Sequence, residues 1–188
     1  VLAMLLSLFA AVMYIRMRFA EYSYGFAAVI ALVHDVIIAL VAVALAIYTG
    51  LVQVEINLAM IAAFLTIIGY SLNDTIVIFD RVRENLPRMK GTLSEVLDVS
   101  INQTLSRTLL TSLTTLITVS LLFAFNAGTG NVIEGFSFAL IIGIISGTYS
   151  TVFIASPALH WFETRRMAKL DGAEKGEAKT PVSAGASS

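Results

Sequence analysis

One carboxylate lies within a long apolar stretch of the sequence, where a charge is costly to bury. Asp74 precedes Asp80 by six residues. Because Asp80 marks the expected inner boundary of this segment, Asp74 lies about 9 Å inside it at a helical rise of 1.5 Å per residue. Tyr70, Ser71 and Asp74 are spaced to share one helix face, with Asn73 adjacent. Such a carboxyl group faces a bundle interior, a partner or water, and can load and release a proton. The less favoured alternative is an Asp that only caps polar groups near the interface.

Arg107 lies at the inner end of the next apolar segment, beside a polar stripe. Threonines recur at helical spacing along one face, with Thr114 at its edge: Thr104, Thr108, Thr111, Thr115 and Thr118. An arginine at a helix end can instead snorkel, and threonines can bond back to their own helix. The stripe favours a wet or helix-packed face. We hypothesise that Arg107 pairs with Asp74 and holds it ionised until a proton or a motion breaks the pair.

Two further polar residues, His34 and Asp35, lie near the middle of another apolar segment. Adjacent residues on a helix point about 100° apart, so the two need not bond each other. A proton relay and a structural hydrogen bond to a neighbouring span explain them equally well. With Ser71, Asn73, Asp74 and Arg107, they complete the predicted proton pathway.

Other patterns indicate packing or exclude chemistry. Ala139, Gly143, Gly147 and Thr151 recur every four residues, a spacing that lets helices approach closely. The sequence has no GxxxxGK[ST] phosphate loop, no HExxH pair and no cysteine, and its two histidines do not make a zinc site. We therefore predict no metal, no cofactor other than a coupling proton, and a transport subunit rather than an enzyme.

The elements that must hold these residues are membrane helices. Of the 188 residues, 57% are hydrophobic and 13% charged, about half the charged fraction usual for a soluble domain. This composition excludes a disordered chain, a nucleic-acid binder and an ordinary water-soluble enzyme. Apolar segments long enough, or nearly long enough, to span a bilayer occupy residues 1–15, 26–48, 58–79, 108–125 and 136–161.

The charges predict the topology of these five segments. All 12 basic residues flank the inner ends of the first, third and fifth segments, whereas the other connections carry only Glu55 and Glu134. Since basic residues stay in the cytoplasm, the C-terminus is expected inside and the N-terminus of this chain outside. Thr92 and Glu95 form a capping-box pattern, which predicts an amphipathic helix near the inner surface within the connection 80–107. We expect a bundle over residues 1–167 and a disordered cytoplasmic tail over 168–188.

Four stretches of the sequence resemble the SecF family of bacterial protein-export subunits. The longest is GYSLNDTIVIFDRVREN at 69–85; the others are ALVHDVI at 31–37, SINQTLSRT at 100–108 and VIEGFS at 132–137. The likeness covers about residues 1–165. Because the chain starts with Val1 inside an apolar run, we expect it to be the C-terminal part of a longer protein, spans two to six of the family's six.

The resemblance implies an all-α integral membrane fold, half of the pseudo-symmetric 12-helix membrane domain of the resistance-nodulation-division superfamily. It implies a multi-pass protein of the bacterial inner membrane that works with SecD and the SecYEG channel. SecA, YajC, membrane lipid and an unfolded translocating polypeptide are the other implied partners, and nucleic acid is not. In the family, the residues matching Asp74 and Arg107 are linked to proton passage that drives late, SecA-independent export steps.

Two alternatives remain beside this interpretation. A small-molecule exporter of the same superfamily would have adjacent acidic residues and a membrane lysine, which Asn73-Asp74 and Arg107 do not match. A non-conducting scaffold that stabilises SecD or SecYEG would use the polar residues as interhelical contacts. Sodium could replace the proton, since Asp74 lies near hydroxyl oxygens.

Overall fold

The computed structural model describes residues 21–52 and 56–177, together with isolated positions between 2 and 14, and it describes side chains as far as Lys169. The predicted first segment, 1–15, therefore lies largely outside the described residues. The end of the predicted tail, 178–188, lies outside them as well.

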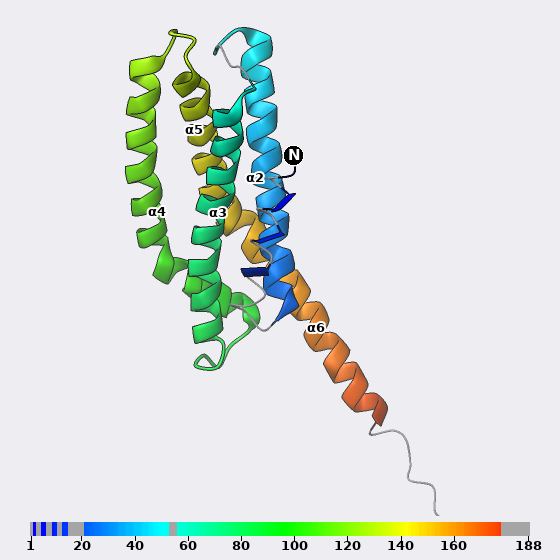
Figure 1. Cartoon of the computed structure of the whole chain (residues 1–188). Coiled ribbons are helices and arrows are strands. Elements are labelled where there is room, and N and C mark those ends of the chain that lie inside the picture. Colours follow the sequence, from blue (N-terminus) through cyan, green and yellow to red (C-terminus); the bar gives the residue numbers. More distant parts are fainter. Residues whose placement is uncertain are drawn as a thin grey trace, which may run out of the picture.

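Within these ranges the chain is a bundle of long helices without strands (Figure 1). The helices are α2 (Tyr22–Thr49), α3 (Leu58–Asn85), α4 (Leu93–Asn126), α5 (Val132–Ser150) and α6 (Ser156–Glu177). Four stretches, α2, α3, α4 and Val132–Lys169, are long and apolar enough to cross a membrane. They contain the second to fifth predicted segments.

Side chains at the helix starts explain where three of these helices begin. Asn57 accepts a hydrogen bond from the Met60 N–H at the start of α3, and Asn131 accepts one from the Glu134 N–H at the start of α5. Thr92 and Glu95 form the predicted capping box. Each oxygen satisfies an N–H that the first helical turn leaves unpaired.

Two predicted boundaries differ from the structure. The expected amphipathic helix after Thr92 and the fourth apolar segment form one 34-residue helix, α4. Figure 1 shows its first turns running at an angle to the rest. Thr104 and Thr111 each donate to two backbone carbonyls of the preceding turn, a pattern that bends helices without ending them. Residues 168–177, the first part of the tail expected to be disordered, continue α6.

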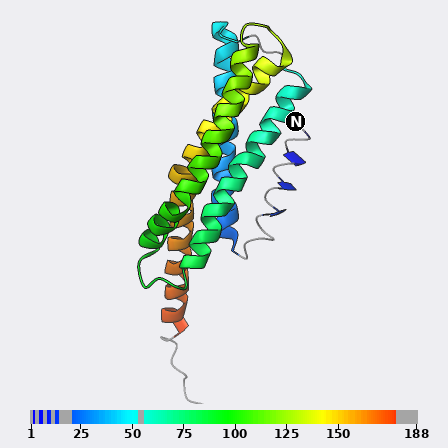
Figure 2. The same cartoon turned by 90° about the vertical axis from the view of Figure 1, so that its left-hand side faces the viewer.

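The long C-terminal helix is interrupted by a π-helical turn, η1 (Thr151–Ala155). Pro157 follows directly. Proline lacks an N–H and its ring collides with the carbonyl four residues earlier, here that of Phe153, so regular α-helical bonding cannot continue. The chain widens into the π turn and proceeds as α6, which extends beyond the bundle (Figure 2).

The core forms around α5, which contacts α2, α3 and α4. One apolar cluster, with Tyr24, Phe79 and Leu159, lies toward the end of the bundle where α6 emerges. We call this the charged end, because the end of α3 with the turn after it, which carry Arg81 and Arg88, and helix α6, which carries Arg165, lie there (Figure 1). A second cluster lies toward the other end. Large apolar side chains of α2 and α4 face outward (Ile37, Val41, Leu110, Phe125), as expected for helices in lipid.

Candidate functional site

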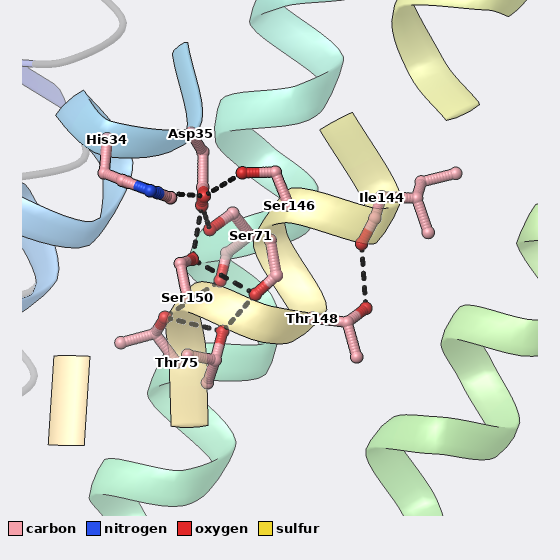
Figure 3. A network of polar contacts seen from close by, with 10 residues as sticks. His34, Asp35, Ser71, Thr75, Ile144, Ser146, Thr148 and Ser150 are labelled. Carbon is pink, nitrogen blue, oxygen red and sulfur yellow. Dashed lines mark hydrogen bonds and ion pairs between the residues drawn. The ribbon is translucent and has the colours of Figure 1, made fainter. Parts of the chain in front are cut away.

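Asp35 is the centre of a buried polar network that joins three helices (Figure 3). Its side chain comes from α2 and is fully buried. Oδ2 accepts hydrogen bonds from Ser71 of α3 at 2.5 Å and Ser150 of α5 at 2.7 Å, and Oδ1 accepts one from Ser146 of α5 at 2.7 Å. Each bond crosses between helices, so the carboxyl group fastens α2, α3 and α5 together.

His34 lies beside this network and contacts it directly. Its Nδ1 is 3.2 Å from Asp35 Oδ1, and 32% of its side chain is exposed whereas Asp35 is enclosed. One of the two explanations offered for these residues, a structural hydrogen bond to a neighbouring helix, is therefore correct for Asp35. The other alternative, a proton relay through His34, has the contact it would need.

Asp74 lies in a second polar cluster between α3, α4 and α5. Its side chain is 3% exposed. Ser112 of α4 approaches it at 3.4 Å, a long hydrogen bond, and Thr148 of α5 in turn donates to Ser112 at 2.9 Å. Ser146 and Ser150 lie on one face of α5 and Thr148 on the opposite face. Helix α5 thus contacts Asp35 directly, through Ser146 and Ser150, and Asp74 indirectly, through Thr148 and Ser112.

The hypothesised ion pair between Arg107 and Asp74 is absent from this structure. The structure describes both side chains, and no ion pair within 4.0 Å joins them, although Arg107 is near enough for its charge to act on Asp74. Arg107 is exposed, since the buried face of α4 contains Thr104, Thr108 and Ser112. A residue next to Thr108 in sequence points about 100° away from that face.

The predicted threonine stripe divides in two. Thr104 and Thr108 are buried against the bundle. Thr111, Thr114 and Thr118 are exposed, and each donates to a carbonyl of its own helix. Thr104, Thr108 and Thr115 also donate to carbonyls of α4, so the alternative of local hydrogen bonding is correct along the whole stripe. The stripe divides because a spacing that mixes three and four residues drifts around the helix.

The small residues of α5 bring α3 close enough for the first network to form. A Cβ at Gly143 would collide with the side chain of Ile67, and one at Gly147 would lie 3.2 Å from the Ser71 Cβ. Ala139 is fully buried on the same face. This close approach places Ser71 between α2 and α5, within reach of Asp35. Asn73 is exposed beside Asp74 and takes no part in the Asp35 network.

Several polar residues of these clusters were not singled out from the sequence. Ser112, Ser146, Thr148 and Ser150 are ordinary helix residues, and the four-residue spacing of Ser146 and Ser150 was the only available signal.

Glu134 is a further buried polar residue that was not singled out for a role. It is 2% exposed, and its carboxylate accepts hydrogen bonds from the N–H groups of Gly128 and Gly130 at 3.0 and 2.8 Å. It fixes the turn before α5.

Asn85, the last residue of the family-like stretch 69–85, likewise has a structural role. Its side-chain amide donates to Ser100 at 2.9 Å and to Gln103 at 3.0 Å, joining the end of α3 to the first turns of α4. Among the described residues, no three His, Asp or Glu side chains group as a metal site would require.

The family model for "Protein export membrane protein SecD/SecF, C-terminal" matches residues 1–165. The chain belongs to the SecD/SecF family. It is 47% identical to the protein translocase subunit SecF of Rickettsia prowazekii over 89% of this chain and 51% of that protein. It is 50% identical to SecF of Desulfurispirillum indicum over 87% of this chain and 50% of that protein.

A solved member of the SecD/SecF family has the same fold. The crystal structure of SecDF in its super-membrane-facing form matches with a TM-score of 0.71 and 38% identity, covering 88% of this chain and 21% of that one. The chain spans about half the length of the curated SecF relatives it matches. It corresponds to their C-terminal portion.

Proposed function

We propose that this chain is the membrane part of a SecF-type translocase subunit that couples proton movement to late steps of protein export. In this proposal it assembles with SecD in the bacterial inner membrane and promotes export through SecYEG after SecA has acted. Membership of the SecD/SecF family and the likeness to SecDF support the assignment. The placement of basic residues at one end supports a cytoplasmic C-terminus.

The observation that carries the coupling proposal is the environment of Asp74. A carboxyl group buried within an apolar helix usually pairs with a cation or accepts several hydrogen bonds. Asp74 has one hydrogen bond to another helix, the long contact of 3.4 Å to Ser112, and no ion pair among the described residues. Asp35, by comparison, accepts three short hydroxyl bonds. Asp74 is therefore the carboxyl group better prepared to exchange a proton.

A buried hydroxyl one turn away supports access of water to this region. The Tyr70 hydroxyl is enclosed and has no hydrogen-bond partner among the described residues. Buried polar groups without a protein partner commonly bind an ordered water. Tyr70 lies four residues before Asp74 and thus on the same side of α3. A water here would extend a proton path toward Asp74.

Protonation of Asp74 would be transmitted through α5. Ser112 contacts both Asp74 and Thr148, and the opposite face of α5 is fastened to Asp35. A change in the Asp74–Ser112 contact therefore acts on a helix that also holds α2 and α3. In this proposal Arg107 approaches Asp74 in another state of the cycle and stabilises the ionised form.

The test is an Asp74→Asn variant in the full-length subunit, co-expressed with SecD. Proton-gradient-dependent export into inverted membrane vesicles should fall to the level without the subunit, while assembly with SecD persists. Glu84→Gln is the matched control, since Glu84 lies on the same helix but is exposed at the charged end; it should export normally. Unchanged export by Asp74→Asn would refute the role of this residue. Replacing the proton gradient with a sodium gradient identifies the coupling ion.

The Asp35 network also favours a second candidate function, a scaffold that stabilises SecD or the channel. Its bonds join helices tightly and need no proton movement. The same Asp74→Asn variant separates the two functions. A variant that assembles with SecD but does not support export excludes a pure scaffold, whereas parallel loss of assembly and export favours it.

A further inference from the structure

Helix α6 carries an aromatic residue and two basic residues in one line where it leaves the bundle. Trp161, Arg165 and Lys169 are spaced four residues apart, so they lie along one face of α6. All three are exposed, Trp161 at 48%. The Arg165 guanidinium lies 3.9 Å from the centre of the Trp161 ring. Together with Phe162 and Arg166, these residues line a cavity of about 530 Å³.

Among the described residues, two of the three basic side chains at this cavity have no acidic partner. Arg166 is occupied, since it pairs with Glu21 at 2.6 Å and with Glu163 at 3.3 Å. Arg165 and Lys169 have no carboxylate within 4.0 Å among the described residues. Within the described part of the chain the cavity therefore presents two unpaired positive charges, and it is suited to an anionic ligand.

The surroundings of the cavity are apolar on the side of the bundle. Phe162 packs edge-on against Trp161 at 4.8 Å between ring centres and lies 6.0 Å from the ring of Phe26 on α2. Phe26 and Ile30 are exposed at 59% and 44% along the same helix. A ligand held here would thus have its charge beside Arg165 and Lys169 and apolar groups over α2.

We propose that this cavity binds the headgroup of an anionic phospholipid in the leaflet at the charged end of the bundle. Arg165 and Lys169 would bind the phosphate, with the guanidinium able to donate two parallel hydrogen bonds. Trp161 lies on α6 where it leaves the bundle, and a tryptophan there would favour the membrane interface; the acyl chains would cover Phe26 and Ile30. This inference concerns α6 and does not depend on proton coupling at Asp74.

The test compares lipid binding by the full-length protein and by charge variants. Native mass spectrometry would measure the binding of phosphatidylglycerol and phosphatidylcholine to the wild type, the double variant R165Q/K169Q, and the matched control R88Q/K90Q. The control removes two exposed basic residues elsewhere at the charged end. A basic residue near an anionic surface contributes about a five-fold preference, so the double variant should lose about 30-fold of the preference for phosphatidylglycerol. The control should lose little.

A second measurement monitors the site itself. Trp161 is the tryptophan of this chain, and its fluorescence is obtained as the difference between wild type and W161F. Brominated phosphatidylglycerol should quench this signal more strongly than brominated phosphatidylcholine, and R165Q/K169Q should remove the difference. Circular dichroism of each variant confirms that the helices persist.

Three outcomes overturn the proposal. Equal phosphatidylglycerol preference in wild type and R165Q/K169Q shows that the cavity does not select the lipid. An equal loss in R88Q/K90Q shows that diffuse charge is responsible. Displacement of the lipid by inorganic phosphate or by polyglutamate in detergent identifies a free anion or an acidic polypeptide as the ligand instead.

Discussion

Replacing Asp35 with alanine should destabilise the bundle far more than the same change at Asp74. Asp35→Ala removes an acceptor that holds Ser71, Ser146 and Ser150 at 2.5, 2.7 and 2.7 Å. At the average of about 0.6 kcal/mol for a side-chain hydrogen bond inside a membrane protein, the loss is about 2 kcal/mol. If the bonds are charge-assisted, each contributes about 1.5–3 kcal/mol and the loss exceeds about 4 kcal/mol.

Asp74→Ala is the matched control for this prediction. Both substitutions place alanine in the interior of a long helix, so the gain in helix propensity is the same. The Asp74→Ala variant loses one hydrogen bond of 3.4 Å to Ser112. This long bond contributes at most about 0.6 kcal/mol to the free energy of unfolding. The two variants should therefore differ by at least about 1.2 kcal/mol in the free energy of unfolding.

The assay is unfolding of the full-length protein in mixed micelles by increasing sodium dodecyl sulfate, followed by far-ultraviolet circular dichroism. Ser150→Ala, which removes one of the three bonds, should fall between the wild type and Asp35→Ala. Combining Ser150→Ala with Asp35→Ala should add little further loss, because the bond is already absent. If Asp35→Ala and Asp74→Ala unfold within 0.5 kcal/mol of each other, the reasoning that α2, α3 and α5 are fastened by Asp35 is wrong.

Three further predictions follow from individual contacts. Gly143→Ala should cost about 1–3 kcal/mol in the same assay through collision with Ile67, and adding Ile67→Ala should recover part of the loss; no recovery would contradict that contact. Glu134→Gln should cost about 1–3 kcal/mol and speed hydrogen exchange at the two loop glycines, whose N–H groups it accepts, and unchanged exchange would rule this out. Tyr70→Phe should cost about 1 kcal/mol, because it removes the hydroxyl that holds the proposed ordered water, whereas a gain in stability would show that the site is dry.

The long apolar segments and their capping residues were predictable because both depend on local sequence. The predicted segments 26–48, 58–79 and 108–125 each lie within one helix, the segment 136–161 runs through α5, η1 and α6, and the Thr92–Glu95 capping box is present. The joining of two elements into α4 was missed, since threonines that bond back to their own helix let it bend and continue. The π turn before Pro157 was missed too, although proline supplies its physical cause.

The polar residues show where sequence reasoning stops. Burial cost alone identifies Asp35 and Asp74 as unusual, because any charge in an apolar helix is unusual. Their partners could not be identified in that way. Ser112, Ser146 and Ser150 are common residues whose importance depends on which neighbour they face. For the same reason the proposed partner of Asp74, Arg107, is exposed in this structure.

The sequence by itself determined that this chain is a membrane protein, which polar residues are costly to bury in its apolar helices, and to which family it is similar. These properties follow from composition, helical periodicity and local motifs. Only the tertiary structure decided that Asp35 is the more firmly bound carboxyl group and Asp74 the less satisfied one. The physical reason is that a hydrogen bond between helices depends on rotation and close approach. Those are set by the packing of Gly143 and Gly147 against α3, which acts between segments far apart in the chain.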